Sequence, residues 1–301
     1  MHSDRPPTIA PAAAARWDRH LPSASPWLHE EVARRMEQRL QWMTLQPQRW
    51  VHWEPLRGGM QAHALLAARY PQAQCHVVHA HPQHDQAARL QLTPPWWKPA
   101  RWIGPGLQFG EPVQPAQMLW ANMVLHMAAD PQALLAQWNR LIESNGFLMF
   151  SCLGPDTVRE LRAVYAAQGW PPASHSFTDM HDWGDMLVHT GFSEPVMDME
   201  RITLTFATPQ RLLQELRELG RNLHPDRFGA LRGRAWHARL LAALGTLARP
   251  DGDGQLELTF EVVYGHAFKA PPRMTVAPEL RVSLDEMRAN LRQVKKNSPP
   301  G

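Results

Sequence analysis

Cysteine is scarce in this sequence, since Cys75 and Cys152 are the only two among 301 residues. Both lie in apolar runs typical of buried strands, so we expect two reduced, buried thiols and no disulfide. Long hydrophobic runs are absent too, and without 18 consecutive apolar residues we expect no membrane-spanning helix. The alanine run at residues 12–15 lacks the continuous apolar segment of a secretory signal, which predicts a cytoplasmic protein.

A basic stripe is also missing. The chain has 31 Lys and Arg against 28 Asp and Glu, with a pI of about 9.1, but the arginines are scattered among acids. Only Lys295 and Lys296 cluster positive charge. We therefore expect no nucleic-acid partner, while an acidic protein partner remains open.

The apolar pattern of residues 25–152 predicts strands that alternate with helices. Ser25 and Pro26 are typical of a helix start, and a helix that begins at Asp130 is expected to end at Asn145 and Gly146. Helices are expected at 25–43 and 60–69, and strands at 50–54, 75–79, 118–121 and 147–152. The continuously apolar strands indicate a parallel sheet with helices on both faces, the doubly wound α/β class.

The second half of the chain adds helices at 156–166 and 179–189 and a strand at 202–206. Two Leu-rich helices are expected within a helical insertion at about 208–250, followed by a one-sided strand at 256–264. Domain organisation is therefore predicted as a flexible segment at 1–24, one domain at 25–275, and a C-terminal helix and tail at 276–301.

Five stretches between residues 117 and 268 resemble the malonyl-acyl-carrier O-methyltransferase family of biotin synthesis. They read WANMVLH (120–126, followed by Asp130-Pro131), GFLMFSCLGPDT (146–157), FTDMHDWGDMLV (177–188), PVMDME (195–200) and YGHAF (264–268). The resemblance implies a Rossmann-like class I methyltransferase, with a seven-stranded, mostly parallel sheet and a helical insertion before the last strand. It also implies S-adenosylmethionine as cofactor, a small carboxylate as acceptor and an acyl carrier protein as partner.

The resemblance implies methyl transfer to a carboxylate, a reaction that needs little chemical assistance from protein side chains. A carboxylate is an adequate nucleophile at neutral pH and a sulfonium is an activated methyl donor. In-line positioning and exclusion of water would therefore supply most of the acceleration, and no catalytic base is expected.

Carried onto this sequence, the family pattern assigns cofactor binding to Glu54, Gly58, Gly59, His79 and Asn122. The sequence departs from the pattern there, because Leu56 and Met60 occupy glycine positions and His79 replaces the ribose-binding acid. Gly58 and Gly59 taken alone indicate an ordinary turn between strand and helix.

Acceptor binding is assigned to Trp17, Asp156, Thr157, His181 and Asp182, with Trp17 standing where the family has tyrosine. Helix capping is the competing interpretation of the last four.

The departures leave two functions open: a methyltransferase that esterifies a malonyl carboxylate, and a binding or regulatory protein that kept the fold and lost the cofactor. A third possibility is that the protein binds the cofactor in a changed pose or binds another small ligand.

The histidines between Cys75 and His84 have ligand types that zinc favours, but their spacing is poor, so we expect no metal site.

Overall fold

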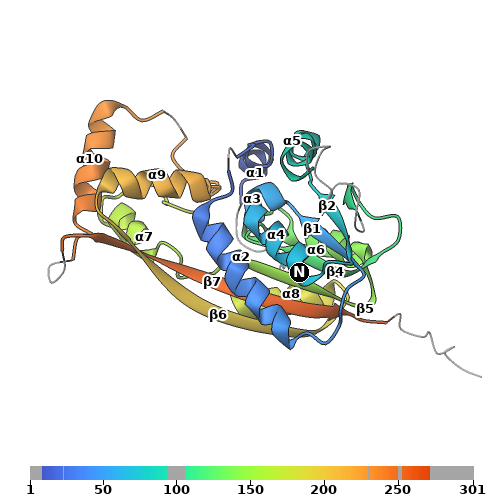
Figure 1. Ribbon diagram of the computed structural model, residues 1–301. Helices are drawn as coiled ribbons and strands as arrows, with labels where there is room; N and C mark the ends of the chain where they lie inside the picture. Colours follow the sequence, from blue (N-terminus) through green and yellow to red (C-terminus); the bar gives the residue numbers. More distant parts are fainter. Residues whose placement is uncertain (1–8, 23, 94–105, 230, 250–252, 272–301) are drawn as a thin grey trace, which may run out of the picture. The chain divides into compact units, whose positions relative to one another are not determined.

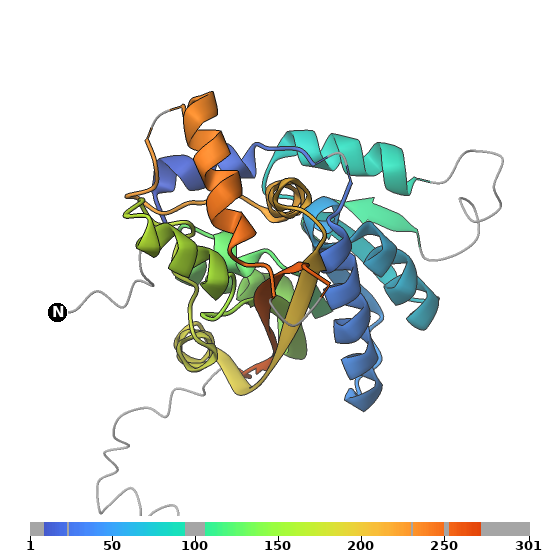
Figure 2. The same cartoon turned by 90° about the vertical axis from the view of Figure 1, so that its left-hand side faces the viewer.

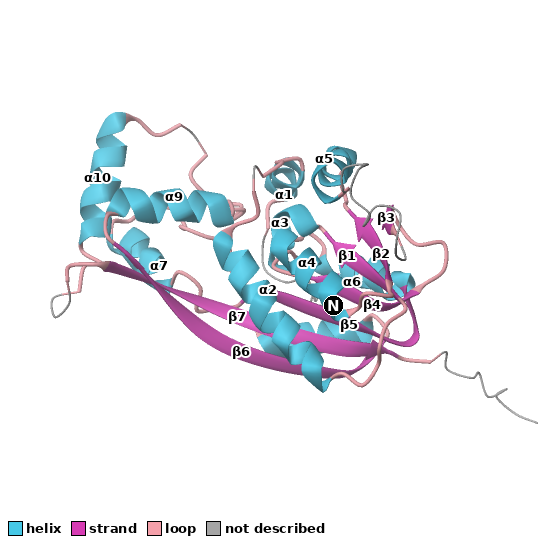
Figure 3. Cartoon of the chain, in the orientation of Figure 1, coloured by secondary structure: helices cyan, strands magenta, loops and turns pink. Residues whose placement is uncertain are grey.

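Seven strands form one mixed sheet in the part of the chain that this computed structural model describes, namely residues 9–22, 24–93, 106–229, 231–249 and 253–271 (Figures 1 and 3). The strands are β1 (Arg49–Trp53), β2 (Gln74–Val78), β3 (Leu107–Phe109), β4 (Ala116–Ala121), β5 (Ile142–Leu153), β6 (Phe192–Phe206) and β7 (Leu256–Lys269). Their order is β3-β2-β1-β4-β5-β7-β6, and β7 alone is antiparallel to its neighbours. The predicted class I methyltransferase fold is thus confirmed.

Two apolar clusters lie on opposite faces of the sheet. On one face pack α2 (Trp27–Arg39), α4 (Met60–Arg69), α5 (Pro82–Leu92), α7 (Arg159–Ala167), α9 (Pro209–Leu219) and α10 (Arg234–Gly245). On the other pack α6 (Pro131–Leu141) and α8 (Met180–His189). Figure 2 shows α2 and α8 on opposite sides of β6 and β7. Burial on both faces explains why β4 and β5 read as continuously apolar sequence.

Short helices complete the described elements: α1 (Pro11–Asp18), α3 (Pro55–Gly58), and the 3₁₀ turns η1 (Leu40–Trp42) and η3 (Leu125–Met127). Helix α1 occupies a segment predicted to be flexible. It buries Ala13, Ala14 and Trp17 against Met127 and Leu223. An eight-residue helix is marginal in isolation, so only this packing stabilises it. The helix expected within 276–301 lies outside the described residues.

The junction between α6 and β5 differs from the sequence prediction. Helix α6 starts as expected, with the Asp130 side chain accepting the Ala133 N–H at 3.0 Å, but it ends at Leu141. Asn145 and Gly146 lie within β5, where the register with β4 shifts. Asn145 has φ 66°, and a Cβ on Gly146 would lie 2.8 Å from the Gln117 carbonyl oxygen. Both residues lie in a bulge between Ile142 and Phe147, and the close approach to β4 there requires glycine at position 146.

Strand β7 is buried on both faces and not on one face as its alternating sequence predicted, because it lies between β5 and β6 inside the sheet. Strands β6 and β7 are much longer than predicted because they pair with each other along almost their whole length. Cys75 and Cys152 are buried and free, as predicted. Among the described residues, no helix is both long and apolar enough to cross a bilayer.

Gly265 on β7 is expected to tolerate no side chain. A Cβ there would overlap the buried Phe150 ring and lie 2.9 Å from the Met197 sulfur. Gly265→Ala should therefore lower the free energy of unfolding by about 1–3 kcal/mol. The matched change Gly184→Ala in α8 meets no atom within 4 Å and should raise it by about 0.5–1 kcal/mol. Urea unfolding of both variants checks this, and equal effects would contradict the packing argument.

Candidate functional site

A cavity of about 270 Å³ opens where β1, β2 and β4 end. Its wall includes residues from all three strand ends and from α1: Trp53, Glu54, Arg57, Ala80, Met123, Val124, Trp17 and Asp18. The strand order reverses between β1 and β4, and ligands of doubly wound sheets bind at that switch point, beyond the carboxyl ends of the strands. The cavity is therefore the candidate cofactor site.

Glu54 lies at the end of β1 in a left-handed conformation, with φ 51°. Its buried carboxylate accepts the Ala80 N–H at 2.7 Å and lies 3.3 Å from His84 Nδ1. Burial alone would raise the pKa of Glu54, but the His84 hydrogen bond, the charge of His79 and the Ala80 N–H together hold that pKa below its ordinary value. The carboxylate thus stays ionised and joins the ends of β1 and β2.

Gly58 allows α3 to pack on the end of β4. A Cβ on Gly58 would lie 2.6 Å from the Asn122 carbonyl oxygen, closer than real Cβ contacts allow. The Asn122 side chain donates to the Gly58 carbonyl and, at 2.8 Å, to the His29 carbonyl, and accepts from Ser151 Oγ at 2.6 Å. The structure therefore brings Gly58 and Asn122 together, and their observed contacts are with other groups of the protein.

Gly59 (φ 129°) leads into α4, and Glu30 of α2 covers the start of that helix. The Glu30 carboxylate accepts the N–H groups of Met60 at 2.8 Å, Gln61 at 3.1 Å and Ala62 at 3.3 Å. Ser25 does not cap α2 as predicted, because its hydroxyl binds Glu30 instead. The anion-binding end of α4 is thus filled by the chain's own carboxylate, which no sequence signal indicated.

Leu56 and Met60 do not line the cavity. Leu56 is buried in the core cluster that includes residues of α2 and α4, and Met60, partly buried, packs against that cluster. Arg57 lines it instead, and its guanidinium donates to the Trp17 carbonyl at 2.6 Å and the His20 carbonyl at 3.0 Å. It also lies 3.6 Å from the Asp18 carboxylate. The sequence analysis missed Arg57, although a basic residue beside Gly58 was a visible signal.

His79 does not line the cavity. Its side chain is fully buried, Nδ1 lies 3.9 Å from Asp85 Oδ1, and neither ring nitrogen has a hydrogen-bond partner among the described residues. The pKa of His79 is lowered, chiefly by burial, despite the nearby Glu54 charge. Ala80 takes the place on the wall, and the carboxylates there are Glu54, Asp18 and Asp130, the last of which caps α6. Throughout the described ranges, no group of three or more His, Cys, Asp or Glu is arranged for a metal ion.

The residues predicted to hold the acceptor are dispersed. Trp17 lines the cavity, and Thr157 lines a neighbouring hollow of about 140 Å³ while exchanging hydrogen bonds with the Glu261 backbone at 3.1 and 3.2 Å. Asp156 pairs with Arg201 at 2.8 Å. His181 and Asp182 lie in the exposed first turn of α8. These last three line neither the candidate cofactor cavity nor the neighbouring hollow.

Solved structures with related topology support the fold. A Bacillus halodurans protein assigned to the methyltransferases superposes with a TM-score of 0.53 at 10% identity, covering 80% of this chain and all of that one. The YcgJ protein of Bacillus subtilis gives a TM-score of 0.52 at 9% identity, covering 80% of this chain and 99% of that one. At such low identity the likeness concerns the fold alone.

Curated relatives are much closer in sequence. The malonyl-[acyl-carrier protein] O-methyltransferase of Gallionella capsiferriformans is 38% identical over 83% of this chain and 87% of its own length. Those of Laribacter hongkongensis and Halorhodospira halophila are 35% and 33% identical, over 87% and 88% of this chain and 87% and 90% of theirs. No protein-family model matches the chain. The extent and identity of these matches show that the chain belongs to the malonyl-[acyl-carrier protein] O-methyltransferase family.

Proposed function

We propose that this protein transfers the methyl group of S-adenosylmethionine to a malonyl carboxylate carried by an acyl carrier protein. The observation that carries the proposal is the cavity at the β1/β4 switch point, in a chain that matches such enzymes over more than four fifths of its length. The family name supplies the acceptor, and the basic pI suits an acidic carrier.

The residues of the cavity wall fit the methionine end of S-adenosylmethionine better than its ribose end. Arg57 and Asp18 offer opposite charges on the cavity wall, which suits the carboxylate and ammonium of a methionine moiety. At the end of β2, where the family has its ribose-binding acid, no free acid is present, because His79 is buried and Glu54 is already bound by Ala80 and His84. We therefore assign the methionine end to Arg57 and Asp18, and expect weaker binding than a complete site would provide.

When bound, S-adenosylmethionine supplies an activated methyl group. The protein's own part is positioning and dehydration, since an ionised carboxylate needs no base. Trp17 and Met123 form apolar wall that excludes water, and the hydrogen bonds from Arg57 to α1 hold Trp17 over the cavity. Residues far from this wall, such as His181, take no part in the proposed chemistry.

Calorimetric titration with S-adenosylmethionine tests the proposal, together with mass spectrometry of malonyl-acyl carrier protein for the methyl ester. Arg57→Ala should weaken cofactor binding about tenfold or more, because it removes a charge-assisted contact. Arg140→Ala, which changes an exposed arginine of α6 away from the cavity, is the matched control. No binding at millimolar cofactor, with no ester formed, would overturn the proposal.

A second candidate function is binding without the cofactor. It is favoured by the internal contacts of Glu54 and Glu30 and by the burial of His79. In this case the native protein binds no S-adenosylmethionine, whereas His79→Asp, which restores the family's acid, gains measurable affinity. Binding by the native protein would exclude this candidate.

A further inference from the structure

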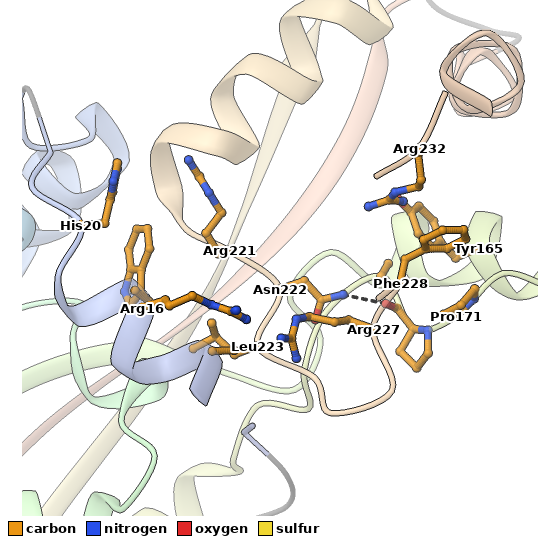
Figure 4. A pocket seen from close by; sticks show the side chains of 14 residues that line it. Arg16, His20, Tyr165, Pro171, Arg221, Asn222, Leu223, Arg227, Phe228 and Arg232 are labelled. Carbon is orange, nitrogen blue, oxygen red and sulfur yellow. Dashed lines mark hydrogen bonds between the residues drawn. The ribbon is translucent and has the colours of Figure 1, made fainter. Parts of the chain in front are cut away.

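A larger cavity, of about 430 Å³, lies between α1, α7 and the chain that follows α9 (Figure 4). Four arginines line it: Arg16, Arg221, Arg227 and Arg232. The described residues of its lining include no aspartate or glutamate. In Figure 4, Arg16 of α1 and Arg227 of the loop after α9 extend into the opening from opposite sides. We call this cavity the arginine pocket.

The pocket arginines have no carboxylate partner within the described residues, whereas Arg35 and Arg69 elsewhere each pair with a glutamate. Backbone carbonyls and aromatic rings position three of them, Arg221, Arg227 and Arg232. Arg221 Nη1 donates to the Gly220 carbonyl at 2.8 Å, and Arg227 Nη1 donates to the His224 carbonyl at 2.9 Å. The Arg232 guanidinium lies 3.8 Å from the Trp236 ring centroid. These contacts leave guanidinium N–H groups free for a ligand.

The four arginines give the pocket a positive electrostatic potential. The pKa of His20 on its rim is lowered by burial and then by the charges of Arg221 and Arg57. The pKa of Arg221 is itself below its ordinary value, because burial and Arg217 disfavour its charge. Four cations that repel one another cost free energy unless an anion offsets them. The arrangement is therefore complementary to a multiply charged anion.

Two further features of the pocket indicate the chemical class of its ligand. Planar guanidinium groups bind phosphate and carboxylate oxygens bidentately, and several together suit the greater charge and oxygen count of a phosphate. Trp17, Tyr165, Leu223 and Phe228 form apolar wall beside the arginines, which suits a short organic chain. Trp17 also lines the candidate cofactor cavity, so the two spaces are neighbours.

We propose that the arginine pocket binds a phosphate ester carried on a short, flexible organic chain. Two sources have this chemistry: a free phosphorylated metabolite, and the phosphopantetheine arm that joins an acyl group to its carrier protein. Only the second source rests on the proposed function, since it needs an acyl carrier as partner. The pocket would then hold the phosphodiester of the arm while the acyl end extends past Trp17.

Binding of 4′-phosphopantetheine, without S-adenosylmethionine, tests the site itself. Fluorescence titration or calorimetry should show binding at least tenfold tighter than that of pantetheine, which lacks the phosphate. Arg227→Glu and Arg221→Glu should each weaken it about tenfold or more, and Arg140→Glu on α6 should not. Circular dichroism verifies folding, and Arg232→Glu replaces any variant that does not fold. Equal affinity for the two ligands, or unchanged affinity in the pocket variants, overturns the proposal.

Holo- and apo-acyl carrier protein identify the source. Tighter binding of the holo form than of the free arm, lost in Arg227→Glu, supports the carrier-borne ester. A free arm that binds as tightly as the holo carrier supports the metabolite. Equal binding of apo and holo carrier, unaffected by Arg227→Glu, contradicts a phosphate site in this pocket. None of these results depends on methyl transfer, so an inactive protein leaves the test intact.

Discussion

Lowering the pH from 7.5 to 5 is expected to destabilise this protein strongly, because it buries several neutral histidines. Burial lowers the pKa of His29, His63 and His175 to about 4, and those of His52 and His126 well below the ordinary value. In the unfolded chain each would titrate near 6.5. The unfolded state therefore binds more protons, and the stability contributed by these groups is complete above pH 6.5 and falls as the pH drops toward 4.

The expected loss of unfolding free energy is a large fraction of the net stability of a typical domain. His29 and His175 are almost fully buried, and each should remove about 2 kcal/mol of stability between pH 6.5 and 5, at about 1.4 kcal/mol per pH unit. Net stabilities are about 5–15 kcal/mol, so protonation of two such groups can remove much of the total. We expect the urea midpoint to fall steeply between pH 6.5 and 5.

Urea unfolding at pH 7.5, 6.5 and 5.5 measures the slope. His29→Asn keeps a donor for the Arg57 carbonyl and removes the titrating ring, so it should flatten the pH dependence. His181→Gln should leave it unchanged, because that ring is 80% exposed. An unfolding free energy that is the same at pH 7.5 and 5.5 would show that the histidines are not buried in their neutral form.

Removal of the Glu54 carboxylate is expected to cost about 2–5 kcal/mol of unfolding free energy, since each donor left without its acceptor costs about 1–3 kcal/mol. Glu54→Ala would leave the Ala80 N–H and the buried His84 ring without their acceptor. Because the pKa of Glu54 is depressed in the folded protein, its contribution is present above about pH 4.5 and is lost as the pH falls through the folded pKa.

Glu54→Gln should lose less, since its amide oxygen can still accept the Ala80 N–H. Urea unfolding at pH 7.5 compares the two variants with Glu257→Ala, which removes an exposed pair with Arg249 and should change stability by less than about 1 kcal/mol. A loss below 1 kcal/mol for Glu54→Ala would place Glu54 among the ordinary surface carboxylates. In that case its carboxylate would be available to a ligand.

Much of the fold could be predicted because local sequence and tertiary structure agree there. Continuous apolar runs mark β4 and β5, and Asp130 and Thr208 cap the helices that they precede. Helix α1, helix α5 and strand β3 were not predicted. Strand β3 has only three residues, and α1 depends on Met127 and Leu223, which lie more than a hundred residues away. Local pattern cannot indicate an element whose stability comes from distant contacts.

The candidate site, too, could be predicted from the sequence only in part. The resemblance pointed to Glu54, Gly58, Gly59 and Asn122, and the structure brings these four together. The family resemblance could not indicate that Leu56 is buried in the core while Arg57 lines the cavity. Adjacent residues of one helical turn point in different directions, and which of them meets the core depends on tertiary packing.

By itself, the sequence determined the class of fold, the family and the absence of a disulfide, since these follow from residue order and composition. The tertiary structure alone decided which charges meet. Glu30 reaches the start of α4, and Arg16 joins Arg221 and Arg227 across some two hundred residues of chain. Such contacts arise when helices pack on a sheet and bring distant side chains into one space, and no local pattern records that proximity.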